Sequence, residues 1–203
     1  TSSDGRTSAI YAPDAKGQIK ALNEAYLEAG IDPSTIGLLE AHGTGTRVGD
    51  KVEFNALKKC FEQSAQKNQT AIGSVKSMIG HTKAAAGAAG IIKTALSLYN
   101  KVLPATLKAL EPDPALDINN SSFYLNSESK PWVSKSALNS SGHPRRSGVS
   151  AFGFGGSNFH IVLEEYTSTK SHVSWDGAVQ IIAFSSDTKE GLLDKINLFK
   201  TVL

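Results

Sequence analysis

The sequence has little cysteine, with only Cys60 among 203 residues. A single cysteine excludes an intrachain disulfide and any zinc site built from several thiolates. The sequence also lacks a large excess of either charge, because 21 Lys and Arg stand against 19 Asp and Glu. The resulting net charge of +2 does not mark a surface for nucleic acid. We therefore expect no nucleic-acid partner and a reducing, cytoplasmic location.

Long hydrophobic runs are also missing. The apolar run over 84–92 is mostly Ala and Gly and ends at Lys93, well short of the roughly 18 residues of a membrane span. The first ten residues lack the basic and then apolar layout of a signal peptide, and they lack an initiating Met. We expect no membrane span and a chain that begins inside a longer protein. The hydrophobic content of 40% is enough for the core of one generous domain.

The first hundred residues contain the same arrangement twice, a short apolar strand followed by a loop and a helix. The predicted elements are a helix over 14–29, a strand over 36–41, a helix opened by a capping box at Asp50–Glu53, a strand over 70–74 and a helix from about Thr82 to Tyr99. The last of these helices begins KAAAGAAG, which is favourable only where another backbone or a ligand comes close. This alternation predicts a layered α/β fold.

The rest of the chain is less regular. The predicted elements are two short strands within FYLNSESKPWV, an antiparallel pair over 146–151 and 158–165, a strand over 178–184, a cap at 185–187 and a final helix with Leu192, Ile196 and Phe199 on one face. A polar stretch precedes the strand over 178–184 and separates it from the antiparallel pair.

Several common catalytic signatures are absent, including GxSxG, GxxxxGK[ST], HExxH and CxxC. We expect no metal site. Cys60 lies next to Phe61 in an amphipathic segment, and we interpret it as a packing residue because a free cysteine usually behaves as a small buried hydrophobe.

Three loops stand out because each follows or ends a predicted strand: 42–46 (HGTGT), 74–81 (SVKSMIGH) and 151–160 (AFGFGGSNFH). Ligands in open α/β sheets gather beyond the carboxyl ends of the strands, so these loops can converge. The first two loops deliver His42 and His81, and the second also delivers Lys76. One such histidine is more often structural, but two in glycine-bracketed loops favour a functional site.

The remaining histidines fit other roles. His160 alternates with two apolar neighbours on a strand, and we interpret it as structural. His143 and His172 lie in polar stretches and are predicted to be solvated.

Three motifs together, EAHGTGT, AIGSVKSMIGHTKAAAGAAG and GVSAFGFGGSNFHIVLEEY, resemble the C-terminal half of β-ketoacyl synthases. These enzymes are the condensing domains of fatty acid and polyketide synthases. The resemblance implies a thiolase-like α/β fold, a layered mixed sheet with flanking helices, over residues 1–166. Residues 167–203 resemble the linker that follows a ketosynthase domain, the start of a small α/β unit with a strand and a helix. Within the family the chain looks most like polyunsaturated fatty acid synthases.

The resemblance implies catalytic roles for four residues. His42 and His81 match the two histidines of the family's Cys-His-His triad, and Lys76 matches the lysine that holds the site together electrostatically. Glu53 matches the carboxylate that pairs with this lysine. The residues themselves leave a second interpretation of Glu53 open, in which its carboxylate caps the helix at the backbone of Asp50.

The resemblance also implies substrate contacts. Thr44 and Thr46 match threonines that hydrogen-bond the pantetheine arm of a carrier protein, although ordinary turn chemistry explains such residues too. Phe152 and Phe154 match gating aromatics, with core filling as the alternative, and the glycines around them, such as Gly155, fit a moving loop.

The family's nucleophilic cysteine, which lies in its N-terminal half, has no match here. We therefore expect a partner half that supplies it, an acyl carrier protein whose phosphopantetheine carries the substrates, a homodimer of the full domain and a downstream acyltransferase domain. No directly bound cofactor is expected. The implied activity is decarboxylative Claisen condensation of malonyl-carrier protein with an acyl thioester, and we expect the chain alone to be inactive.

Two other interpretations remain. The chain can be a non-catalytic scaffold or chain-length-type partner subunit of the same fold, or a CoA-dependent thiolase relative. The enzyme is favoured because a decayed partner would have no reason to keep four polar residues at one buried site.

Overall fold

The computed structural model describes residues 1–5, 12–62, 67–109, 111–134, 142–166 and 184–200. The chain forms two compact units, Thr1–Thr167 and Ser168–Leu203. The strands are β1 (Ser2–Ser3), β2 (Leu38–Glu40), β3 (Thr70–Gly73), β4 (Val102–Leu103), β5 (Phe123–Leu125), β6 (Lys130–Pro131), β7 (Arg146–Gly153) and β8 (Ser157–Glu164). The α-helices are α1 (Ala15–Ala29), α2 (Arg47–Cys60), α3 (Lys76–Ile79), α4 (Ala86–Asn100) and α5 (Lys189–Lys200). Short 3₁₀ helices span Pro33–Thr35, Lys83–Ala85, Pro114–Leu116 and Ile118–Asn120.

A six-stranded mixed sheet forms the centre of the first unit, in the order β1-β8-β7-β2-β3-β5. Strand β2 runs parallel to both β3 and β7, and β3 runs parallel to β5. Strand β8 pairs antiparallel with β7 and with β1, while β4 and β6 form a separate two-stranded ribbon. The predicted layered α/β fold, the two strands in FYLNSESKPWV and the antiparallel pair are confirmed.

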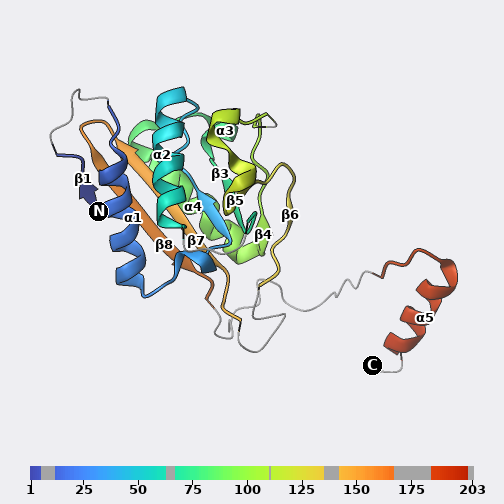
Figure 1. Ribbon diagram of the computed structural model, residues 1–203. Helices are drawn as coiled ribbons and strands as arrows, with labels where there is room; N and C mark the ends of the chain where they lie inside the picture. The colour runs from blue at the N-terminus through green and yellow to red at the C-terminus, as the bar shows by residue number, and fades with distance from the viewer. Residues whose placement is uncertain (6–11, 63–66, 110, 135–141, 167–183, 201–203) are drawn as a thin grey trace. The chain divides into compact units, whose positions relative to one another are not determined.

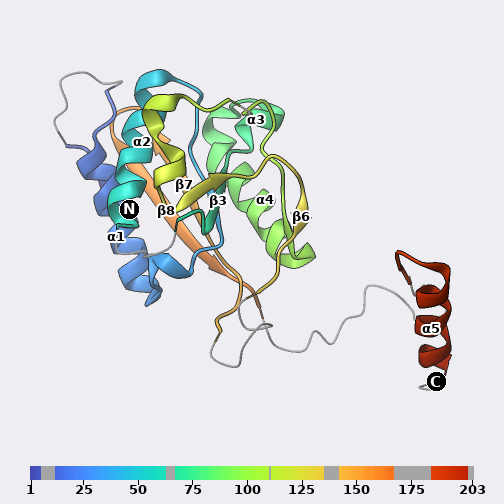
Figure 2. The same cartoon turned by 45° about the vertical axis from the view of Figure 1, so that its right-hand side comes forward.

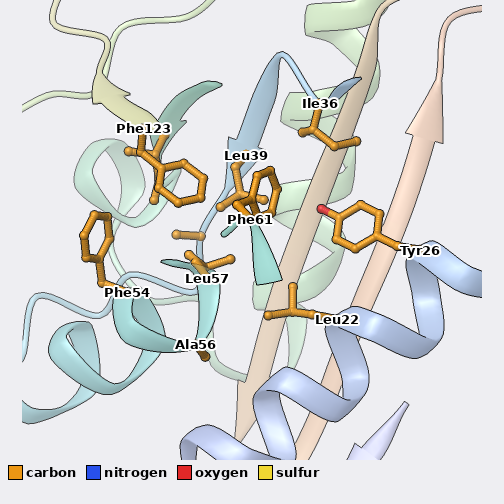
Figure 3. Packing of buried hydrophobic residues seen from close by; sticks show 11 residues of the cluster. Leu22, Tyr26, Ile36, Leu39, Phe54, Ala56, Leu57, Phe61 and Phe123 are labelled. Carbon is orange, nitrogen blue, oxygen red and sulfur yellow. The ribbon is translucent and has the colours of Figure 1, made fainter. Parts of the chain in front are cut away.

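Helices cover both faces of this sheet (Figures 1 and 2). Alternation along β2 sends Leu38 and Leu39 to different clusters, because successive side chains of a strand point to opposite faces. Leu39 packs toward α1 and α2, and this cluster is drawn in Figure 3: Leu22, Tyr26, Ile36, Leu39, Ala41, Phe54, Ala56, Leu57, Phe61, Ile72 and Phe123. Leu38 joins the α4 side: Ala71, Leu98, Leu103 and Trp132. Burying each such large side chain contributes roughly 1.5–3 kcal/mol.

Helix α1 has the predicted ends. The side chain of Asp14 accepts a hydrogen bond from Lys16 N–H, and Gly30 ends the helix with a left-handed φ of 62°. Helix α2, in contrast, begins earlier than predicted. Thr46 caps it by accepting from Gly49 N–H over 3.2 Å, so Asp50 lies in the first turn and the predicted capping box does not form. The threonine that ends HGTGT is itself a good N-cap, which explains the earlier start.

Smaller differences appear elsewhere. The loop after β3 contains the short helix α3, where no helix was predicted. In the second unit, α5 presents the predicted face of partly buried Leu192, Ile196 and Phe199. Its cap is Thr188, whose hydroxyl accepts from Gly191 N–H over 3.1 Å, rather than the predicted 185–187. The strand predicted over 178–184 falls, except for its last residue, outside the described residues.

Among the described residues, none of the helices combines the length and the apolar character needed to cross a membrane.

Candidate functional site

Two histidines meet where neighbouring parallel strands end. His42 follows β2 and His81 follows β3 and α3, and their ring centroids lie 5.5 Å apart at an interplanar angle of 84°. The ring of Phe152, near the end of β7, lies 5.7 Å from that of His42. Strands β3, β2 and β7 are consecutive and parallel, so their carboxyl ends share one edge of the sheet. The structure therefore brings the three predicted loops together.

Both imidazole rings accept a backbone hydrogen bond at Nδ1. Phe152 N–H donates to Nδ1 of His42 over 3.3 Å, and Lys83 N–H donates to Nδ1 of His81 over 3.0 Å. A backbone N–H can only donate, so each Nδ1 carries no proton and each neutral ring carries its hydrogen on Nε2. The site thus contains two Nε2–H donors.

The surroundings favour the neutral form of both rings. Burial lowers the pKa of His42 to about 4, with further lowering by the Lys76 ammonium and by His81. Partial desolvation also lowers the pKa of His81, and Lys76 and Lys83 add to the effect. Desolvation lowers the pKa of Lys76 below its ordinary value, and the nearby Glu53 and Glu40 partly oppose this effect. A cation held beside the two rings disfavours their protonation.

Glu53 acts on the backbone of the first histidine. Its Oε1 accepts from His42 N–H over 2.7 Å and its Oε2 accepts from Gly43 N–H over 2.8 Å. Burial raises the pKa of Glu53 to about 7, while these two N–H groups and Lys76 lower it. Neither of the two interpretations from the sequence describes this geometry. Within the described part of the chain, Glu53 makes no capping-box bond to Asp50 and no direct ion pair with Lys76, which acts on it through space.

The predicted substrate-contact residues lie around this centre, and all but Phe152 are exposed. The hydroxyl oxygens of Thr44 and Thr46 are 3.2 Å apart, and Thr46 is occupied as the cap of α2. Phe152 is partly buried against His42, whereas the side chain of Phe154 is 78% exposed. Gly155 lies in the turn between β7 and β8 with a φ of 80°.

Two other predictions concern buried groups. His160 is structural, because Nδ1 lies 3.0 Å from the Ser150 hydroxyl and Nε2 lies 3.1 Å from the Tyr26 hydroxyl. Burial lowers its pKa to about 3. The Cys60 thiol is partly buried and lies 3.3 Å from Asn23 Oδ1, and burial raises its pKa to about 11.

His143 is partly buried and its Nδ1 lies 2.8 Å from Pro144 O, so the prediction of a solvated ring is wrong. His172 lies outside the described residues. No cluster of three or more His, Cys, Asp or Glu able to hold a metal occurs in the ranges that the structure describes.

Sequence reasoning missed a buried ion pair beside the site. Glu40, only 2% exposed, accepts from Lys93 Nζ at Oε2 over 2.7 Å and from Val75 N–H at Oε1 over 2.5 Å. The available signal was a glutamate at the end of an otherwise apolar strand. Such a buried carboxylate requires a partner.

Comparison with known proteins places the chain in a family. The model of the β-ketoacyl synthase C-terminal domain matches residues 1–109, and that of the ketoacyl-synthetase C-terminal extension matches residues 112–202. The chain belongs to the β-ketoacyl synthase family.

Similar proteins are large synthases. The chain is 46% identical over 171 residues to a polyunsaturated fatty acid synthase of a Thraustochytrium species, a match that covers 81% of this chain and 6% of that protein. It is 45% identical over 168 residues to polyketide synthase PksL of Bacillus subtilis, covering 82% of this chain and 4% of the relative. The chain therefore spans a small part of these relatives.

Solved ketosynthases share the fold. The ketosynthase from module 6 of the bacillaene synthase of Bacillus subtilis superposes with a TM-score of 0.76 at 44% identity, covering 81% of this chain and 29% of that one. An oxazolomycin ketosynthase domain from Streptomyces albus gives a TM-score of 0.78 at 33% identity, covering 96% of this chain and 34% of that one. The predicted thiolase fold of a ketosynthase is thus confirmed.

Proposed function

We propose that this chain supplies the enolate-stabilising half of a decarboxylating condensing site. When carbon dioxide leaves a malonyl thioester, the electron pair of the broken bond passes to the α carbon and spreads onto the thioester oxygen. The Nε2–H groups of His42 and His81 donate to this oxygen as its charge develops. Fixed donors of this kind contribute about 10²–10³-fold each to the rate. The observation that carries the proposal is the backbone hydrogen bond to Nδ1 of each ring.

The neighbouring residues have supporting roles in this proposal. Lys76 keeps the imidazoles neutral, because its ammonium lowers the pKa of both rings. Glu53 holds the backbone that carries His42. Thr44 and Thr46 hydrogen-bond the pantetheine arm, a role supported by their exposed position in the lining of a pocket that also contains Lys76.

The turn between β7 and β8 is the proposed acyl gate. Phe152 contacts His42, while Phe154 and Gly155 are exposed next to it in the chain. Movement of the turn would expose or cover the acyl pocket.

The remaining parts of the reaction come from partners. In the proposed enzyme, an N-terminal half supplies the nucleophilic cysteine that takes up the acyl group, and a carrier protein delivers the malonyl unit on phosphopantetheine. Residues 1–166 are then the C-terminal half of this acyltransferase, a 3-oxoacyl-[acyl-carrier-protein] synthase type of enzyme, and 167–203 are the linker toward a downstream acyltransferase domain. The full domain forms a homodimer. Cys60 cannot replace the nucleophile, since burial keeps its thiol protonated.

The decisive experiment uses the complete domain with His42→Ala and His81→Ala. We expect each variant to lose at least 100-fold in the release of carbon dioxide from malonyl-carrier protein, while the domain stays folded. His143→Ala is the matched control, because its ring faces the Pro144 carbonyl, and its rate should be unchanged.

Full decarboxylation by both variants would overturn the proposal and favour a non-catalytic scaffold. This chain alone, mixed with acyl and malonyl carrier protein, should form no 3-ketoacyl product.

A further inference from the structure

The carboxylate of Glu40 connects three elements next to the candidate site. Glu40 ends β2, two residues before His42. Its oxygens contact Val75 N–H, in the turn after β3, and the Lys93 ammonium, on α4, over 2.5 and 2.7 Å. The side chains of Glu40 and Lys93 are only 2% and 10% exposed. This ion pair is therefore an internal connection between two strand ends and a helix.

Helix α4 has a glycine, Gly90, where it packs against the Glu40 side chain. A Cβ built on Gly90 would lie 3.2 Å from Glu40 Cγ and 3.0 Å from Val149 Cγ1, which is tighter than ordinary packing. Gly90 is buried, and its missing side chain lets α4 approach β2 and β7 at this point. The close approach expected from the KAAAGAAG sequence is in part an approach to Glu40.

General stability does not explain the pair. A buried ion pair gains little over a well-packed apolar pair of the same volume, because both charges lose their hydration. What the pair provides is a connection to Val75, the residue directly before Lys76. Charged and titratable groups face Lys76 from several elements: Glu40 on β2, Glu53 on α2, and His42 and His81 in the loops. Loss of the Glu40 charge would remove one of the two negative neighbours of the Lys76 ammonium.

We infer that Glu40, held by Lys93, is a positioning residue for decarboxylation: it fixes the turn that carries Lys76 relative to the loop that carries His42. This inference rests on the proposed function. Glu40 does not touch the substrate and acts only through Val75 and Lys76. The chemistry that depends on Lys76 and the two imidazoles is therefore sensitive to Glu40, whereas uptake of the acyl group by the cysteine of the N-terminal half is not.

The test compares the two half-reactions in the complete ketosynthase domain. Glu40→Gln keeps an oxygen for Val75 N–H but loses the charge, and Lys93→Met leaves the carboxylate without its cation. We expect decarboxylation of malonyl-carrier protein to fall at least tenfold in each variant, with cysteine acylation within threefold of the parent.

A second ion pair is the matched control. Arg145 and Glu165 are similarly buried, at 11% and 14% exposure, with Nη1 and Oε2 2.7 Å apart. Arg145 directly precedes β7, whereas Phe152 lies near the opposite end of this strand. Glu165→Gln should leave both half-reactions unchanged.

The double variant Glu40→Gln, Lys93→Met guards against misfolding of the single variants, because it leaves no unpaired buried charge. It should show the same selective loss of decarboxylation. A parallel fall of both half-reactions, or no change in either, would overturn the inference. His42→Ala is measured alongside: if it decarboxylates normally, the proposed function fails, and if it alone is impaired, only the role of Glu40 fails.

Discussion

Phe152 N–H donates a hydrogen bond to Nδ1 of His42 over 3.3 Å, and the two residues are 110 positions apart in the chain. The bond fixes the orientation of the ring and leaves its hydrogen on Nε2. His81 obtains the same arrangement locally, from Lys83 only two residues further on. One ring therefore depends on strand pairing within the sheet, and the other on a short turn.

The low pKa of His42 predicts activity in mildly acidic solution. Because this pKa is about 4 in the folded protein instead of the ordinary 6.5, the neutral ring persists as the pH falls below 6.5. The acid limb of decarboxylation by the complete domain should therefore lie below pH 6.5. An unfolded chain takes up this proton near pH 6.5, so the free energy of unfolding should decline as the pH falls from 6.5 toward 4. A rate that already halves at pH 6.5 would contradict the neutral ring.

Glu53→Gln should lower both the stability of the domain and its rate of decarboxylation, although the two side chains are nearly the same size. The two carboxylate oxygens accept from two consecutive N–H groups, of His42 and Gly43, and a carboxamide can satisfy only one of them. The unsatisfied buried donor costs about 1–3 kcal/mol of stability, and decarboxylation should fall at least tenfold. Thermal unfolding and carbon dioxide release measure the two effects. Asp50→Asn is the control, because this partly buried carboxylate accepts from Gly45 N–H at Oδ1 and not from His42 or Gly43, and it should change little.

Two leucines on helix α1 should differ sharply in their contribution to stability. Leu22 is fully buried in the cluster of Figure 3, whereas Leu27 is 83% exposed. Leu22→Ala should lower the free energy of unfolding by about 2–5 kcal/mol, and Leu27→Ala by less than about 0.5 kcal/mol. Chemical denaturation of the complete domain provides both values. Equal effects would show that α1 does not pack on the sheet as described.

Phe154→Ala should alter the handling of the acyl chain without destabilising the fold. The ring is 78% exposed, so its removal leaves no cavity in the core. We expect an unchanged melting temperature, unchanged malonyl decarboxylation and a changed rate of acyl transfer or range of accepted chain lengths. An unchanged product profile would count against the gate.

Cys60 should be an unreactive thiol. With a pKa of about 11, it is ionised to only about 1 part in 1,000 at pH 8, roughly 100-fold less than a thiol of pKa 9. Alkylation by iodoacetamide should therefore be about 100-fold slower in the folded chain than in urea. Cys60→Ala should leave decarboxylation by the complete domain unchanged.

Much of the fold was predictable because periodicity and glycine placement act locally. The ends of α1, the β7–β8 pair and the strands β2 and β3 follow from apolar spacing and from residues such as Asp14 and Gly30. The start of α2 was not predicted correctly, since two capping signals compete there and Thr46 prevails over Asp50.

The convergence of the three loops was predictable from the sequence, but the hydrogen bonds and ion pairs within the site were not. The contacts of Glu53 with His42 N–H and of Glu40 with Val75 N–H are tertiary, and a sequence shows neither the distance nor the direction of a side chain. The exposed face of His81 and the occupied hydroxyl of Thr46 likewise depend on how the loops fold.

The pairing of Glu40 with Gly73 in the β2–β3 ladder has a mechanical consequence. A slip of this ladder by one residue would reverse the faces of β2, turning Leu39 out of its cluster and carrying Glu40 away from Lys93. The register of β2 against β3 therefore determines both the packing of the core and the position of the Glu40 carboxylate. Inserting a single residue into β2 should disable the enzyme far more surely than lengthening a connection on its surface.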